Sequence, residues 1–337
     1  MMRLPRFRYL APRSVREAAA TLADLGPEAA PLAGGTDLFP NMKRRQQTPQ
    51  TVVGLRGIEA LHAKSGTAAT GITIGAMTKL STVERDPALL AASPALARAA
   101  SLVATPPIRN SATLGGNCCL DTRCSYYDQT HEWRQAIGFC MKKEGDTCWV
   151  APGSTRCWAV SSSDTAPVLC AAGAEVTLVS KGGERRIAMA DLFADDGIAY
   201  LTRRPDEILT SVHLPPVKAG QRTTYLKLRR RGSFDFPVLG VAAHVRVGTD
   251  GIVEGARLFL GGVGSRPHAA AAAAEFLVGK RLADEEVVLE AARLAGGVAK
   301  PLQNTDFSSS WRKQVTREYV ARALRELAGT AAPARRA

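Results

Sequence analysis

The chain has 337 residues, enough for two domains of roughly 150 residues each, and domains of that size bury a stable core without disulfide bonds. Apolar residues make up 45% and charged residues 22% of the chain, which excludes a disordered protein and a small disulfide-stapled scaffold. No run approaches the ~18 consecutive apolar residues of a membrane span, and the basic start lacks the apolar core of a signal peptide. We therefore expect a cytoplasmic protein that neither spans a membrane nor is exported.

The charge balance is strongly basic. Lys and Arg number 44 against 31 Asp and Glu, a formal net charge of +13. An excess of this size attracts polyanions or an acidic partner protein. No zinc finger, RNA-binding aromatic pair or basic heptad region accompanies the charge, so we expect no nucleic-acid partner, although a basic nucleic-acid binder stays an alternative. The densest basic runs, residues 43–45 and 227–231, are interpreted as solvated or interfacial surface.

The first part of the chain alternates predicted strands and helices, which is typical of an α/β fold. A strand near residues 7–9 precedes a helix at 14–25, in which Ser14 is the expected N-cap and Glu17 the capping-box residue. Further strands are predicted at residues 29–32, 52–55, 69–74 and 175–179. Further helices are predicted at 87–104 and at 161–172, with Asp164 near the start of the second.

The order of predicted strands and helices changes near residue 223. Strand-like runs at 225–228, 238–247 and 256–260 come first, and helical patterns at 269–277, 285–295 and 312–327 follow. Strands followed by helices indicate a separate α+β domain. The Pro-rich and Gly-containing stretch at 215–220 is the expected linker.

Two glycine pairs follow apolar or small-residue runs. One is Gly34-Gly35-Thr36, and the other lies within Thr113-Leu114-Gly115-Gly116-Asn117. Because glycine has no Cβ, such pairs let backbone N–H groups converge on an anion, and a dinucleotide pyrophosphate suits that arrangement. Neither motif is GxGxxG or GxxxxGK[ST], which excludes a Rossmann or P-loop site at the level of motifs. Taken singly, each pair is equally compatible with an ordinary tight turn.

The chain has seven cysteines, an odd number that favours thiols or metal ligands over a complete disulfide set. Cys124, Cys140, Cys148 and Cys157 are spaced C-x15-C-x7-C-x8-C, which is neither zinc-ribbon spacing nor the compact ferredoxin pattern. Four thiolates match the ligand count of a [4Fe–4S] cluster or of a structural zinc ion. Four free buried thiols are the third interpretation, and spacing alone leaves all three open.

The motifs taken together resemble the FAD-binding signatures of one family, the flavoprotein subunits of the molybdenum hydroxylases (the xanthine oxidase family). They are Ala-Gly-Gly-Thr-Asp-Leu at 33–38, Thr-Leu-Gly-Gly-Asn at 113–117 and Ser-Asp-Thr-Ala-Pro at 163–167. The run from Gly261-Gly262-Val263-Gly264 to Arg266-Pro267, ahead of an alanine-rich helix, resembles the C-terminal domain of that family. The similarity covers residues 5 to 325.

One departure from the family pattern is informative. In the family the Gly-Gly-Asn motif is followed closely by the Ser-Asp motif, whereas a long insert separates Asn117 from Asp164 here. The insert, with Cys124-Ser125-Tyr126-Tyr127 and Phe139-Cys140, resembles the segment of 4-hydroxybenzoyl-CoA reductase β subunits that carries a [4Fe–4S] cluster. This resemblance favours an iron–sulfur cluster over zinc or free thiols.

The resemblance implies an α+β fold. Residues 1–217 would form an FAD-binding domain of two α/β subdomains, with a cluster-binding insert at 119–160, and residues 222–330 a C-terminal domain of antiparallel sheet and helices. It implies FAD contacts at Pro31, Leu32, Ala33, Gly34, Gly35, Thr36, Asp37, Leu38, Val103, Thr113, Leu114, Gly115, Gly116, Asn117, Asp164 and Lys227. It implies [4Fe–4S] ligands at Cys124, Cys140, Cys148 and Cys157. Cys118 and Cys119 are expected to serve in packing, with a ligand role as the alternative, Cys170 is expected to lie in the core, and no catalytic residue is expected on this chain.

The resemblance also implies partner subunits. A large subunit would carry a molybdenum cofactor and a small one two [2Fe–2S] clusters, in a dimer of heterotrimers, a heterohexamer, with reduced ferredoxin as electron donor. The complex would remove the phenolic hydroxyl of 4-hydroxybenzoyl-CoA in anaerobic aromatic degradation. Two alternatives are a flavin subunit of another molybdenum hydroxylase, with a different aromatic or heterocyclic substrate, and a zinc-stabilised binding protein without flavin.

Overall fold

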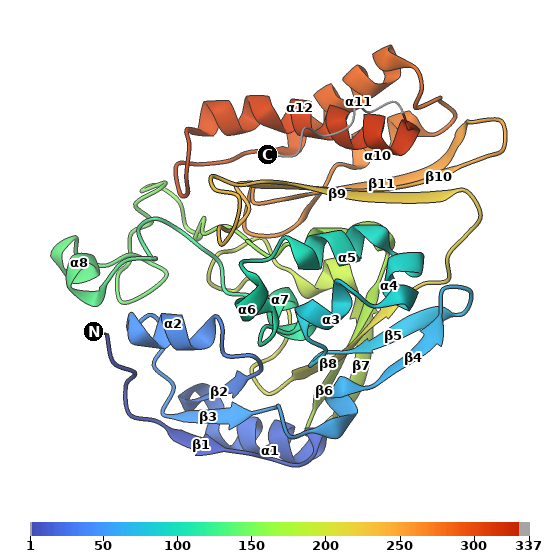
Figure 1. Ribbon diagram of the computed structural model, residues 1–337. Helices are drawn as coiled ribbons and strands as arrows, with labels where there is room; N and C mark the ends of the chain where they lie inside the picture. The colour runs from blue at the N-terminus through green and yellow to red at the C-terminus, as the bar shows by residue number, and fades with distance from the viewer. Residues whose placement is uncertain (1, 330–337) are drawn as a thin grey trace.

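The computed structural model describes residues 2–329. Within these residues the strands form three sheets, which follow one another from the bottom to the top of Figure 1. The two sheets of the first 217 residues are covered by short helices, and the third carries its helices on the side away from them. Across the same residues, no helix combines the length and the apolar character needed to cross a membrane.

The first sheet is parallel, with strand order β1-β3-β2. Its strands are β1 (Arg8–Leu10), β2 (Ala29–Leu32) and β3 (Thr51–Gly54). Helix α1 (Val15–Leu25) buries Ala18, Ala19 and Leu22 in a core shared with Val53. The predicted cap is confirmed, since Ser14 Oγ accepts a hydrogen bond from the Glu17 N–H at 3.1 Å and so satisfies one free donor of the first turn.

The second sheet is antiparallel, with order β4-β5-β8-β6-β7. Its strands are β4 (Lys64–Thr67), β5 (Gly71–Gly75), β6 (Glu175–Ser180), β7 (Gly183–Ala188) and β8 (Ile208–Leu214). The strands predicted at 69–74 and 175–179 are confirmed as β5 and β6. The two edge strands β4 and β7 went unpredicted because most of their residues are exposed, so they lack the apolar alternation of a half-buried strand.

Short helices pack around the first two sheets. They are α2 (Leu38–Lys43), α3 (Leu80–Val83), α4 (Pro87–Ala92), α5 (Pro94–Ser101), α6 (Pro106–Arg109), α7 (Leu114–Cys118) and α9 (Thr165–Ala172), with 3-10 turns at Gly26–Glu28, Glu59–His62 and Met189–Leu192. The prediction of a single helix at residues 87–104 was wrong. These residues form two helices, because Pro94 disfavours a helical Ser93 and cannot continue the hydrogen-bond ladder, and Ser93 caps α5 instead.

The third sheet is antiparallel, with order β12-β11-β10-β9. It contains β9 (Gln221–Leu228), β10 (Leu239–Val247), β11 (Val253–Gly261) and β12 (His268–Ala269), and the helices α10 (Ala271–Leu277), α11 (Glu285–Val298) and α12 (Ser309–Ala328) cover its outer face. The predicted order of strands and then helices is confirmed. All eight residues of α9 are buried, because this helix lies against α5 on one side and against β10 and β11 on another.

Residues 119–160, here called the cysteine segment, form an excursion with little regular structure. It contains the helix α8 (His131–Ala136), which projects at the left of Figure 1 beyond α2. Two backbone hydrogen bonds of 2.8 and 2.7 Å between Arg123 and Val160 close the base of the excursion. The segment therefore leaves and rejoins the body of the molecule at one place.

Candidate functional site

The three motifs meet around one cavity of about 490 Å³. Its wall contains the chain that leaves β2, the start of α7 and the start of α9. The candidate residues in the wall are Pro31, Leu32, Ala33, Gly34, Gly35, Thr36, Asp37, Leu38, Val103, Thr113, Gly115, Gly116, Asn117 and Asp164. Leu114 is fully buried in the neighbouring core, and Lys227 is held behind Asp164.

Glycine at position 34 allows two of the motifs to touch. A Cβ at Gly34 would lie 2.1 Å from the backbone oxygen of Ser111, just before the second motif. A Cβ at Gly116 would lie 3.7 Å from the Cβ of Ala33, so the two motifs are in direct contact. The sequence-based expectation of two glycine turns was half right. Gly35, with a φ of +73°, is in a turn, whereas Gly115 and Gly116 lie in the first turn of α7.

Asn117 joins the second motif to the third. Its side-chain oxygen accepts hydrogen bonds from Ser163 Oγ at 2.9 Å, from the Thr165 N–H at 3.2 Å and from Thr165 Oγ1 at 2.7 Å. All three residues are buried. Because unsatisfied buried donors are costly, this single amide fixes the start of α9 beside α7.

Asp164 links the cavity wall to the C-terminal sheet. Its carboxylate accepts hydrogen bonds from Lys227 Nζ at 2.9 Å and from Tyr225 Oη at 2.8 Å. Lys227 Nζ also donates to the carbonyl of Leu102 at 3.0 Å. Burial raises the pKa of Asp164 and lowers that of Lys227, and in each case the partner charge opposes the shift. The pair therefore places an ionisable group in the cavity wall and ties that group to the C-terminal sheet.

Several cavity residues were missed by the sequence reasoning. They are Asp121, Arg123, Tyr200, Arg203, Glu207, Phe234, Asp235 and Phe236. They come from the cysteine segment, from the stretch before β8 and from the loop between β9 and β10. No motif unites them, and the only signal was that Phe234 and Phe236 closely follow the basic run at 227–231.

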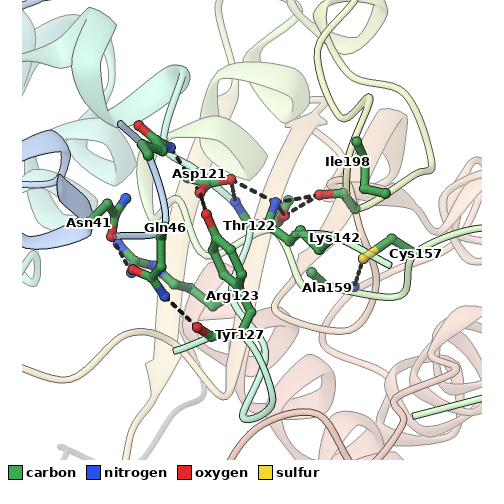
Figure 2. Close-up of polar contacts among 12 residues, drawn as sticks. Asn41, Gln46, Asp121, Thr122, Arg123, Tyr127, Lys142, Cys157, Ala159 and Ile198 are labelled. Carbon is green, nitrogen blue, oxygen red and sulfur yellow. Dashed lines mark hydrogen bonds and ion pairs between the residues drawn. The ribbon is translucent and has the colours of Figure 1, made fainter. Parts of the chain in front are cut away.

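Arg123 ties the cysteine segment to the cavity. Its guanidinium forms ion pairs with Asp37 and with Asp128, the latter at 3.2 Å. It also donates to Asn41 Oδ1 at 3.3 Å (Figure 2). The guanidinium also lies over the ring of Phe236, 4.5 Å from its centroid. Burial raises the pKa of Asp37, and the neighbouring Arg123 opposes that rise. The base of the segment is therefore anchored to the first motif.

The four candidate ligands in the segment are free and buried, with exposed fractions of 5 to 7%, whereas its fifth cysteine, Cys119, is half-buried. Burial raises the pKa of Cys124 to about 12 and that of Cys157 to about 11. The charges of Cys140 and Cys157 raise the pKa of Cys124 further, and those of Cys148 and Cys140 do the same to Cys157. Each thiol therefore lies within electrostatic reach of at least one other.

The backbone around these cysteines forms tight turns. The carbonyl of Cys140 accepts hydrogen bonds from the N–H groups of Lys143 and Gly145, and that of Cys124 accepts from those of Tyr127 and Asp128. Within residues 2–329, however, no three His, Cys, Asp or Glu side chains are arranged to hold one metal ion. The thiols therefore share one neighbourhood without forming a closed ligand set.

Comparison with known proteins gives the family. A model described as the FAD binding domain in molybdopterin dehydrogenase matches residues 5–217, and one described as the CO dehydrogenase flavoprotein C-terminal domain matches residues 223–327. The chain belongs to the FAD-binding subunits of the molybdenum hydroxylase family. The predicted family and the predicted binding of FAD are thereby confirmed.

Relatives of this FAD subunit belong to enzymes that act on different substrates. The carbon monoxide dehydrogenase medium chain of Afipia carboxidovorans is 29% identical over 94% of this chain and 95% of its own length. The FAD-binding subunit of an Escherichia coli aldehyde oxidoreductase is 30% identical over 74% and 79%, and the nicotinate dehydrogenase FAD-subunit of Eubacterium barkeri is 28% identical over 83% and 82%.

Solved structures of the family share the whole fold. A chain of the Cu,Mo-CO dehydrogenase in its cyanide-inactivated form superimposes with a TM-score of 0.80, at 27% identity, over 98% of this chain and all of its own. A chain of quinoline 2-oxidoreductase from Pseudomonas putida 86 does so with a TM-score of 0.76, at 25% identity, over 98% and 99%. The chain is therefore an oxidoreductase subunit of the medium, FAD-carrying type.

The contact at Gly34 makes a direct prediction. In Gly34→Ala the new methyl group would overlap the carbonyl of Ser111, so the first motif must move away from the second and the cavity must open. We expect the variant to retain less than a tenth of the FAD bound by the wild type, measured by flavin absorbance after gel filtration. Gly57→Ala is the matched control, since its Cβ would meet its nearest atom at 3.9 Å. Equal flavin content in Gly34→Ala and Gly57→Ala would contradict the packing argument.

Proposed function

We propose that this chain is the FAD and [4Fe–4S] electron-transfer subunit of a molybdenum-containing reductase acting on 4-hydroxybenzoyl-CoA. The reaction replaces the phenolic C–OH bond by C–H, consumes two electrons and two protons, and releases water and benzoyl-CoA. The observation that supports the proposal is the cysteine segment, in which four thiols are buried within electrostatic reach of one another and whose base lines the cavity with Asp121 and Arg123. The likeness of this insert to that of 4-hydroxybenzoyl-CoA reductase β subunits supports the choice of substrate.

FAD would be held by the three motifs. The turn at residues 31–38 and the first turn of α7 offer backbone N–H groups for the pyrophosphate. Val103 and Asp164, backed by Lys227, line the wall that would face the ring system. When bound, FAD accepts and releases electrons singly or in pairs. The protein's part is to exclude water, to fix the orientation of the cofactor and to hold the Asp164–Lys227 charges beside it.

The cluster would be held by Cys124, Cys140, Cys148 and Cys157. Their number and chemistry suit four-thiolate ligation, and their burial suits a site that is shielded from water. The irregular backbone of the segment, with Phe139 and Glu144 at positive φ, provides turns rather than helix or strand around the site.

The partners follow from the same proposal. A large subunit would hold the molybdenum cofactor and the substrate, and a small one two [2Fe–2S] clusters, in a dimer of heterotrimers. A reduced ferredoxin would supply single electrons through the cysteine segment, and the net charge of +13 would attract this acidic donor.

A second candidate function is the same flavin role in a molybdenum hydroxylase with another substrate. It is favoured by the relatives described above, which are subunits of a carbon monoxide dehydrogenase, an aldehyde oxidoreductase and a nicotinate dehydrogenase. Assay of the assembled complex decides between the two. We expect turnover of 4-hydroxybenzoyl-CoA with reduced ferredoxin and less than a hundredth of that rate with nicotinate, aldehydes or carbon monoxide. Preferred turnover of any of the latter would favour the second candidate.

The cluster ligands can be tested separately from the substrate. Protein purified without oxygen is expected to contain four iron atoms per FAD beyond those of the partner subunits, as four thiolates imply. Cys140→Ala should lose this iron and keep FAD, because Cys140 does not line the cavity. Cys170→Ala is the matched control, since Cys170 is an equally buried thiol in α9. Iron and flavin analysis would contradict the ligand assignment if Cys140→Ala retained its iron.

Electrostatic attraction of the donor makes a further prediction. Raising the ionic strength from about 0.01 to 0.15 M shortens the Debye length from about 30 to 8 Å, which screens the basic surface from an acidic ferredoxin. We expect the second-order rate constant for ferredoxin oxidation to fall at least tenfold, measured by stopped flow. A small uncharged reductant serves as control, and its rate should stay constant. A rate constant with ferredoxin that does not depend on salt would contradict electrostatic attraction of this donor by the basic surface.

A further inference from the structure

Lys142 occupies a buried position between the FAD cavity and the cysteines. It follows Cys140 by two residues, and its side chain is only 6% exposed. Its Nζ donates to Asp121 Oδ1 at 2.8 Å, to Thr122 Oγ1 at 2.7 Å and to the carbonyl of Gly197 at 2.6 Å. Figure 2 shows these contacts converging on one ammonium group. All three donors of the ammonium are thereby used.

On one side, this ammonium is connected to the cavity wall through Asp121. Asp121 lines the cavity, and its second carboxylate oxygen accepts hydrogen bonds from Tyr127 Oη at 3.1 Å and from Gln47 Nε2 at 3.0 Å. Lys142 Nζ also lies 5.2 Å from the ring centroid of Tyr200, another cavity residue. The negative end of the ion pair therefore belongs to the cavity.

On the other side, the ammonium is connected to Cys157 through Gly197. The Gly197 N–H donates to the carbonyl of Cys157 at 2.9 Å. A Cβ at Gly197 would lie 2.7 Å from Cys157 Sγ, so glycine is what lets this strip of backbone approach the sulfur. Lys142 Nζ bonds the carbonyl of this same Gly197, so the positive end of the pair lies beside the backbone that packs against the Cys157 sulfur.

Buried charges of this kind act strongly on nearby electron carriers. In a partly dehydrated site the interaction between two charges is several times larger than in water. A cluster that gains an electron gains a negative charge, which a nearby ammonium stabilises and a nearby carboxylate destabilises. Lys142 and Asp121 should therefore shift a reduction potential in opposite directions.

We propose that Lys142 is a positioning residue for electron transfer, whose ammonium favours the reduced form of the cluster. Its partner Asp121 supplies the compensating negative charge, which lies in the wall of the FAD cavity. This proposal rests on the proposed function, because it requires a cluster on the four cysteines. It differs from a purely structural role, in which both ends of the ion pair would matter in the same way.

The experiment uses the assembled complex, purified without oxygen, and a redox titration of this cluster followed by electron paramagnetic resonance. Lys142→Gln should lower the midpoint potential by about 59 mV or more, the equivalent of a tenfold change in a one-electron equilibrium. Asp121→Asn should raise it, because the negative charge is removed while the amide oxygen can still accept the hydrogen bond of Lys142. Lys142→Arg should stay close to the wild type.

Lys143→Gln is the matched control. Lys143 is the next residue, but its side chain is 27% exposed and its partner Glu144 is exposed, so its removal should leave the potential unchanged. Shifts of the same sign in Lys142→Gln and Asp121→Asn, or no shift in either, would overturn the role of Lys142. If Lys142→Gln lost its iron, an unchanged potential in Asp121→Asn would overturn it equally. Absence of the extra iron from wild-type protein would overturn the proposed function itself.

Discussion

The buried ion pair between Asp164 and Lys227 is the interaction on which the arrangement of this protein depends. Asp164 belongs to the first 217 residues and Lys227 to the C-terminal sheet, and both side chains are almost fully buried. Removing two charges from water is costly, and the cost is offset only where the geometry is good and further hydrogen bonds are made. Tyr225 and the carbonyl of Leu102 provide those bonds. The C-terminal sheet is thus fixed beside the cavity, which Phe234, Asp235 and Phe236 from its β9–β10 loop help to line.

The cavity itself results from close approaches between segments that are distant in sequence. The lack of a Cβ at Gly34 allows the carbonyl of Ser111 to pack against it. The side-chain oxygen of Asn117 accepts hydrogen bonds from Ser163 and Thr165. Neither contact is strong alone, but each would leave a clash or an unpaired polar group if it were changed. The same logic extends to Arg123, which joins the cysteine segment to Asp37 in the cavity wall.

The cysteine segment is positioned by both domains rather than by its own structure. The backbone carbonyl of Asn304 accepts a hydrogen bond from the Ser125 N–H at 2.8 Å, and its side-chain amide donates to the carbonyl of Trp158 at 2.6 Å. These contacts lie next to Cys124 and Cys157 in sequence. Because the segment has little helix or strand of its own, the placement of its thiols depends on the docking of the C-terminal domain.

The sequence by itself determined most of the apolar strands, the succession of strands and helices in the C-terminal domain, the cap at Ser14, the three motifs and the family, because these depend on local periodicity and on short residue patterns. Its resemblance to the family also placed Asp164 and Lys227 among the candidate residues. The division of the helix at Pro94 was a local signal as well, although the prediction overlooked it. Only the tertiary structure decided that the exposed edges β4 and β7 pair with the second sheet and that Lys142 lies between cavity and cysteines. These outcomes depend on contacts between residues far apart in the chain, and such contacts leave no pattern in neighbouring residues.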